Sequence, residues 1–179
     1  MRSTQLFLFS ILLVIGLQHP ISAQSSDPSY VSATLGVGLP DLVGVGVRLH
    51  DENFQLGVSG GTIPFAEDQY YTLSLNAFFH LFGSAKLSSR KPWFAKVGVT
   101  YHKYENENVR TTENYLGTAI GREFNFTNHF GVSLDIGALY LISHESVDKT
   151  PPSNNLFEFD LDLTFPVLPS ASLIFFYKF

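Results

Sequence analysis

The sequence predicts an all-β protein, an eight-stranded, antiparallel, up-and-down β-barrel that crosses a membrane. Large apolar residues alternate with small or polar ones along most of the chain after residue 24, and a period of two is that of a β-strand. The small partners are mostly Gly, Ser and Thr, which suits the narrow interior of an eight-stranded barrel. Only 15% of the residues are charged, compared with about 25% in average soluble proteins.

A soluble sandwich or lipocalin-like barrel is the alternative fold. Its strands would alternate too, but its outer face would be rich in Lys, Glu and Thr, and its inner face would carry the bulk. Because the non-apolar face of this chain is mostly glycine and small hydroxyl residues, we expect the bulky side chains to face lipid and the small ones to face the lumen.

Residues 1–23 are predicted to form a secretory signal peptide, and residues 24–179 the barrel domain. Arg2 precedes an apolar run from Leu6 to Leu17, which is shorter than the roughly 20 residues of a membrane-spanning helix. Pro20 interrupts this run, and Ala23 stands at a plausible cleavage site. A buried helix of a soluble protein is the alternative interpretation of the same run.

The chain contains no cysteine. Disulfide bonds, thiol catalysis and a lipid anchor on an N-terminal cysteine are therefore excluded. After the signal peptide, no apolar run approaches the roughly 18 residues that indicate a transmembrane helix. A membrane-bound form of this protein must therefore cross the bilayer as strands.

Four strands are expected in the first half of the chain. Each has apolar residues at alternate positions and ends in a polar or Pro-containing turn, at 40–41, 51–53, 64–69 and 83–92. The third strand is the least regular, because Gly60 and Gly61 blur its second half. The expected strands are Tyr30–Leu39, Val43–His50, Phe54–Ser59 and Tyr71–Leu81.

Four more strands are expected in the second half, separated by an acidic loop at 105–113, a short turn at 126–128 and a loop at 143–155. They are Trp93–His102, Leu116–Glu123, Phe130–Tyr140 and Ser170–Phe179. The expected lengths of about 9–11 residues are those that tilted strands need to cross a bilayer.

The alternation of the last strand continues backwards to Phe157, which is too long for one crossing. Pro166 and Pro169 favour a break, because proline cannot donate a hydrogen bond to a sheet. We therefore interpret Leu156–Phe165 as an extension of the last hairpin outside the membrane. A ninth strand is the alternative, but an even number of strands returns both chain ends to the same side.

Four charged residues share the inward-facing phase on four different strands: Arg48, Lys96, Glu123 and Asp135. A charge inside a narrow barrel must be paired or hydrated. We therefore predict a salt-bridge and hydrogen-bond network that plugs the lumen. A path for protons or small ions is the alternative.

Aromatic residues near the ends of strands predict the girdles that mark the two membrane interfaces. Tyr71, Trp93, Tyr101 and Tyr140 belong to this set. Generic strand composition would be the alternative explanation.

The sequence indicates neither an enzyme nor a cofactor. No histidines have metal-ligand spacing, no phosphate-binding glycine loop is present, and there is no basic patch for nucleic acid. Ser143, His144, Glu145 and Ser146 could be imagined as a hydrolase site, but such residues in a polar stretch are usually only a loop. We expect no catalytic residues and no bound metal.

The final strand carries apolar and aromatic residues at alternate positions, Leu173, Phe175, Tyr177 and Phe179, and ends on an aromatic residue. Residues 24–179 resemble the small outer-membrane β-barrel protein family, the OmpA/OmpX-like eight-stranded type. Three features carry this resemblance: the signal peptide, the strand pattern and this last strand. The resemblance implies a place in the outer membrane of a Gram-negative envelope, contact with outer-membrane lipid, and insertion by the barrel-assembly machinery, which recognises these last residues.

The expected function is a non-enzymatic structural or surface-interaction role for a barrel with a plugged lumen. A narrow, porin-like pore or transporter for small solutes is the first alternative, and a lipid-modifying outer-membrane enzyme is the second.

Overall fold

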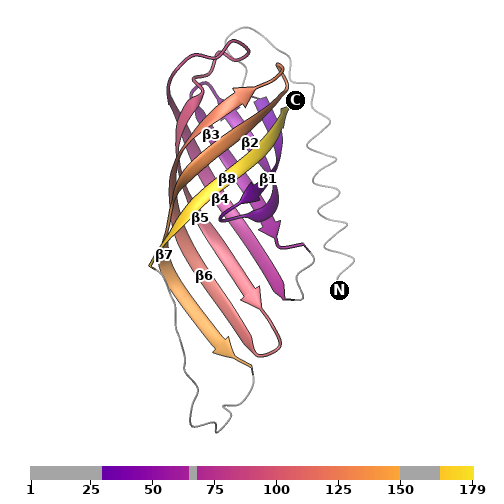
Figure 1. Cartoon of the computed structure of the whole chain (residues 1–179), viewed down its shortest axis with the longest axis vertical. Helices are drawn as coiled ribbons and strands as arrows, with labels where there is room; N and C mark the ends of the chain where they lie inside the picture. The colour runs from indigo at the N-terminus through magenta and orange to yellow at the C-terminus, as the bar shows by residue number, and fades with distance from the viewer. Residues whose placement is uncertain (1–29, 65–67, 150–165) are drawn as a thin grey trace.

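The computed structural model describes residues 30–64, 68–149 and 166–179, which form one closed antiparallel barrel with the strand order β1 to β8 (Figure 1). β8 pairs with both β7 and β1 and so closes the barrel. The predicted fold class is therefore confirmed. The strands are β1 (Tyr30–Gly38), β2 (Leu42–Asp51), β3 (Phe54–Thr62), β4 (Gln69–Phe82), β5 (Trp93–Glu105), β6 (Val109–Asn125), β7 (Phe130–Asp148) and β8 (Val167–Lys178).

The outer surface of the barrel is apolar on all eight strands. Val45 and Ile136 have 64% and 66% of their surface exposed, values that water-soluble proteins rarely combine over a continuous surface. One exposed apolar residue from each strand in turn is Leu35, Val45, Val58, Leu73, Val99, Ile120, Ile136 and Phe175. In the part of the chain that the structure describes, no helix is long and apolar enough to cross a membrane.

The interior of the barrel is polar, with a few rings. Buried hydroxyl, amide, imidazole and charged side chains line it, together with the rings of Phe78, Phe94 and Phe176. These rings need glycine beside them. A Cβ on Gly121 would lie 2.3 Å from Cζ of Phe94, so only a residue without a side chain leaves room for that ring. Glycine on the inner face therefore provides the space that the inward-facing ring occupies.

Five strands are longer than the expected 9–11 residues: β4, β5, β6, β7 and β8 have 14, 13, 17, 19 and 12 residues. The expected loop at 105–113 is a hairpin whose connection is only 106–108, and the expected loop at 143–155 begins as strand up to Asp148. These two loop predictions were wrong because polar residues stand on both faces of the added segments, and apolar residues such as Val147 are too few there to alternate. Apolar alternation cannot reveal such strands, although their backbones pair regularly.

Two other strand boundaries in the structure differ from the predicted ones. β3 continues through Gly60 and Gly61 to Thr62, and β8 begins at Val167 and contains Pro169, which lies opposite Ala138. The signal peptide and the segment Leu156–Phe165 lie outside the described residues.

The two ends of the barrel differ. We call the end with Tyr30 and Phe179 the terminal end and the opposite end the loop end. At the loop end the β1–β2 hairpin is short, whereas β5, β6 and β7 continue beyond it (Figure 1). We call this extension, residues 102–115 and 141–149, the wing.

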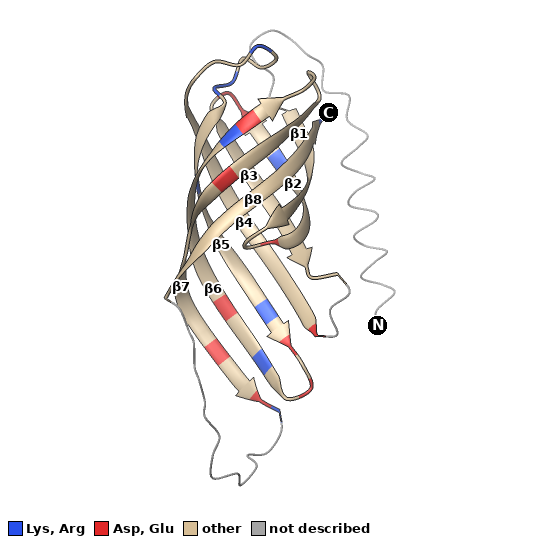
Figure 2. Cartoon of the chain, viewed as in Figure 1, with Lys and Arg blue, Asp and Glu red and all other residues tan. Residues whose placement is uncertain are grey.

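The outward side chains change from mainly apolar to mainly polar where the wing begins. Tyr101, Leu116 and Tyr140 are followed by polar outward residues such as Lys103 and Glu145. Figure 2 shows bands of acidic and basic residues on β5, β6 and β7 near the strand ends farthest from the C-terminus. The continuous apolar belt therefore ends at the base of the wing, although Ile142 and Val147 remain exposed apolar residues within it.

Candidate functional site: the closed lumen

Glu123 on β6 is the centre of a buried cluster near the terminal end of the lumen. Its side chain is almost completely buried, and it accepts hydrogen bonds from Arg90 Nη2 to Oε2 at 2.8 Å and from Gln55 Nε2 to Oε1 at 2.9 Å. His80 Nε2 lies 4.0 Å from Oε1 and 2.7 Å from Gln55 Nε2. Arg48 Nη1 is more distant, at 3.9 Å from Oε1. Both carboxylate oxygens are thus satisfied by Arg90 and Gln55.

Arg90 enters this cluster from the β4–β5 turn, not from a strand. It is 5% exposed, and its Nη1 donates to Nδ1 of His50 at 2.6 Å while Nη2 binds Glu123. Nε2 of His50 lies 2.7 Å from Oγ of Ser32. A turn residue therefore folds back into the barrel and closes its terminal end. The sequence showed a basic turn, but nothing in it indicated which cation points inward.

A second buried cluster joins β5, β7 and β8 inside the lumen. Lys96 on β5 donates from Nζ to Oδ1 of Asp135 on β7 at 2.5 Å, and Ser172 on β8 donates to the other oxygen, Oδ2, at 2.6 Å. The four predicted inward charges thus all lie in the lumen, but they divide between two clusters: Arg48 and Glu123 in the first, Lys96 and Asp135 in the second.

Asp41 closes the lumen from the loop end. It lies in the β1–β2 turn and accepts hydrogen bonds from Ser59 and Ser74, each at 2.5 Å. Ser74 is in turn 2.9 Å from the hydroxyl of Thr100. A Cβ on Gly61 would lie 1.7 Å from the carbonyl oxygen of Asp41, so the turn is packed directly against β3. Sequence analysis placed Asp41 in a turn but did not identify it as an inward residue.

Three polar layers therefore lie across the lumen: the Asp41 turn, the Lys96–Asp135 pair, and the Glu123 cluster with Arg90. Each layer bridges different strands by charged or hydroxyl hydrogen bonds. An ion that crossed would have to separate these buried partners, and leaving a buried charge without its partner costs several kcal/mol. Chemically, the arrangement cross-links strands on opposite sides of the lumen.

The inner face of the wing carries one further cluster, around Glu113. Tyr115 donates to Oε2 at 2.8 Å, and Nδ1 of His102 and Nδ1 of His144 each lie 3.1 Å from one carboxylate oxygen. Burial alone would raise the pKa of Glu113, but the hydrogen bonds from Tyr115, His102 and His144 outweigh it, and the pKa is lowered. Glu113 is therefore held as a carboxylate.

An irregularity in the β6–β7 ladder, where Asn114 pairs with Ser143 but Tyr115 pairs with Leu141, brings His144 to the inner face. The side chains of Ser143 and His144 bind different partners, Asn114 and Glu113. The imagined hydrolase residues thus do not converge. In the described part of the chain, no group of three or more His, Cys, Asp or Glu side chains is arranged to hold a metal ion.

The outer face of the wing tip is organised by Glu105. It pairs with Lys103 at 2.7 Å, Lys149 at 2.8 Å and Arg110 at 2.9 Å. Hydrogen bonds from Arg110, Lys103 and Lys149 lower the pKa of Glu105. These pairs are partly or largely exposed, so each adds little to stability. They give the wing a charged, water-exposed outer surface.

The predicted girdle residues all point outward. Tyr71, Tyr101 and Tyr140 lie where the apolar belt meets the wing, and Trp93 lies near the terminal end, stacked on Phe82 at 5.8 Å. In β8, the side chains of Phe175 and Tyr177 are exposed on the outer face, with Leu173 in the same phase and Phe179 following the strand.

No protein-family model and no curated protein matches this sequence. Among solved structures, the N-terminal β-barrel domain of OprF from Pseudomonas aeruginosa is similar, with a TM-score of 0.58 and 17% identity over 87% of this chain and 100% of that chain. CarO2 from Acinetobacter baumannii is similar with a TM-score of 0.50 and 16% identity, over 86% of this chain and 100% of that chain. At these identities the likeness shows the fold alone, a closed eight-stranded antiparallel β-barrel.

Proposed function

We propose that the chain is an integral β-barrel of the bacterial outer membrane with a closed lumen, and that it acts without catalysis as a structural or surface-interaction protein. The observation that carries this proposal is the inverted distribution of polarity. Bulky apolar side chains are exposed around the whole belt, while charged and hydroxyl side chains are buried in the middle. Such a surface is stable in lipid and would aggregate in water.

The size of the belt supports this placement. On β7 it runs from Phe130 to Tyr140, a stretch of about 37 Å at roughly 3.4 Å per residue. Tilted by about 45°, it would be about 26 Å tall, close to the roughly 25 Å apolar band of outer-membrane barrels. The wing would then stand outside the cell, and Tyr30 and Phe179 would lie at the periplasmic side. Lipid would cover the belt, and the barrel-assembly machinery would recognise Leu173, Phe175, Tyr177 and Phe179.

A narrow pore is the second candidate, and one feature favours it. Asp41 and Arg90, which close the two ends of the lumen, both come from turns. Either could move away without any break in the strand ladder. A pore would therefore need these turns to rearrange and the Lys96–Asp135 pair, which lies on β5 and β7, to separate.

Conductance in planar bilayers separates the two candidates. We expect the wild-type barrel to show no steady channels, because all three polar layers stay in place. Arg90→Ala should produce brief, small openings, because Glu123 loses its strongest partner. Lys86→Ala, a change to an exposed cation in the same turn, should behave like the wild type. Steady channels in the wild type would replace the closed-lumen proposal with the pore.

A further inference from the structure

Arg48 is a buried cation without a hydrogen-bonded carboxylate. It is 3% exposed, and its guanidinium lies over the ring of Phe78 at 4.4 Å. Its Nη1 is 3.9 Å from Oε1 of Glu123, beyond hydrogen-bond range, and has no hydrogen-bond partner among the described residues. Arg90 and Gln55 already occupy the carboxylate of Glu123. A guanidinium buried in this way costs free energy unless something else neutralises it.

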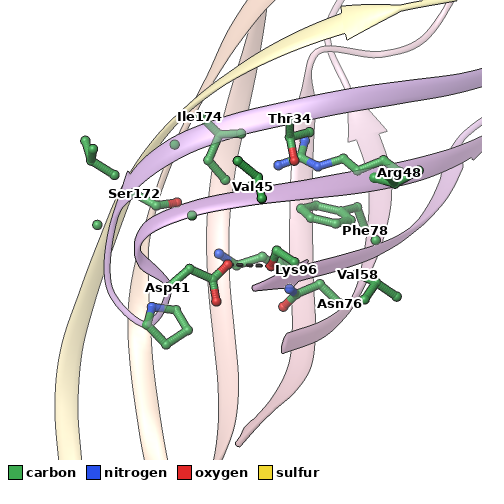
Figure 3. A pocket seen from close by; sticks show the side chains of 18 of the residues that line it. Thr34, Asp41, Val45, Arg48, Val58, Asn76, Phe78, Lys96, Ser172 and Ile174 are labelled. Carbon is green, nitrogen blue, oxygen red and sulfur yellow. Dashed lines mark hydrogen bonds between the residues drawn. The ribbon is translucent and has the colours of Figure 1, made fainter. Parts of the chain in front are cut away.

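The side chain of Arg48 borders a cavity beneath the β1–β2 turn. The cavity measures about 40 Å³, and Thr34, Asn76, Lys96 and Ser172 also line it. Figure 3 shows these side chains gathered around it from different strands. One water molecule needs about 10–15 Å³ by this measure, so the cavity holds one small ion or a few waters. Organic anions of metabolite size are too large for it.

The buried charges around the lumen are predominantly positive. Among the described residues, Arg48, Arg90, Lys178 and the nearly buried Lys96 are balanced by only two buried carboxylates, Glu123 and Asp135. Asp41 also borders the cavity, but it is only partly buried, and both of its oxygens already accept hydroxyl hydrogen bonds. Waters in the cavity would satisfy the donors of Arg48 but would leave its charge uncompensated.

We propose that this cavity is a binding site for a small monovalent inorganic anion of halide size. Arg48 supplies the charge and the main donors. Lys96 uses one proton for Asp135 and has two others to offer, while the amide of Asn76 and the hydroxyl of Thr34 can donate as well. The anion takes the place that a carboxylate would have in an ordinary buried ion pair.

Bromide is a suitable probe, because it scatters anomalously and resembles chloride in size. Crystals of the purified, refolded barrel grown in sodium bromide should show an anomalous peak within hydrogen-bond distance of Arg48. In detergent, the Tm of the wild type should rise with bromide and saturate, relative to sodium gluconate at equal ionic strength, because a ligand of the folded state stabilises it. Arg48→Met should lose this difference, and Arg110→Met, which removes an exposed guanidinium, should keep it.

Absence of a bromide peak in wild-type crystals would overturn the proposal, and so would an equal bromide-dependent rise in Tm for the wild type and Arg48→Met. If Arg48→Met does not fold, the wild-type crystals decide alone. The result does not depend on the proposed function. Halide binding is measured on the isolated barrel, whereas the closed lumen is tested by conductance.

Discussion

Replacing Glu123 with Gln is expected to lower the free energy of unfolding by about 3–5 kcal/mol, the cost of leaving buried charges without their partner. The substitution preserves the shape of the side chain but removes the only carboxylate that hydrogen-bonds Arg90 within the part of the chain that the structure describes. It also removes the nearest negative charge from Arg48. Urea unfolding of the barrel refolded into lipid vesicles measures the change.

Glu145→Gln is the matched control, because Glu145 is exposed on the outer face of β7. Its substitution should change stability by no more than about 0.5 kcal/mol. A double variant of Glu123→Gln with Arg90→Ala should recover part of the loss, because the two residues share one interaction. A loss below about 1 kcal/mol for Glu123→Gln would mean that the cluster does not depend on this carboxylate.

Replacing Ile136 with Arg should cost about 2–4 kcal/mol in a bilayer, because this is the penalty for a cation near the midplane on the lipid-facing side of a barrel. Ile136 lies near the middle of the belt on β7 and is 66% exposed. In a water-soluble barrel, an exposed position of this kind would accept arginine at almost no cost.

Val147→Arg on the same strand provides the comparison. Val147 is 50% exposed, but it lies in the wing, opposite Arg110. We expect a cost of about 0–1 kcal/mol there, as for positions near or beyond the interface. Equal costs for the two substitutions, measured by unfolding in the same vesicles, would contradict the assignment of the belt to lipid.

The eight strands and their faces were predictable from the sequence, because a strand in a barrel must alternate between two different environments. The belt residues Val45, Leu73 and Ile136 all lie on the predicted side. The wing was not predictable by the same rule. There, Lys103 pairs with Glu105 on one side and His102 lies beside Glu113 on the other, so the alternation of hydrophobicity disappears although the backbone pairing continues.

The candidate site was predictable only in part. The inward phase of Arg48, Lys96, Glu123 and Asp135 followed from their positions in the strands, but their partners depend on the stagger between strands, which the sequence does not give. The residues that turns contribute to the lumen could not be predicted from the sequence at all. Arg90 enters the lumen because its turn folds back over the terminal end, and no local sequence signal distinguishes it from the exposed Lys86 in the same turn.

The fluorescence of Trp93 tests the central claim most directly, because it is the only tryptophan of the chain and lies on the outer surface near the terminal end. If the bulky outer side chains contact lipid, phospholipids brominated on the acyl carbons nearest the headgroups will quench Trp93 strongly, and iodide in the water will quench it weakly. Strong quenching by iodide with none by the brominated lipids would mean that this surface faces water, and the membrane assignment would be wrong.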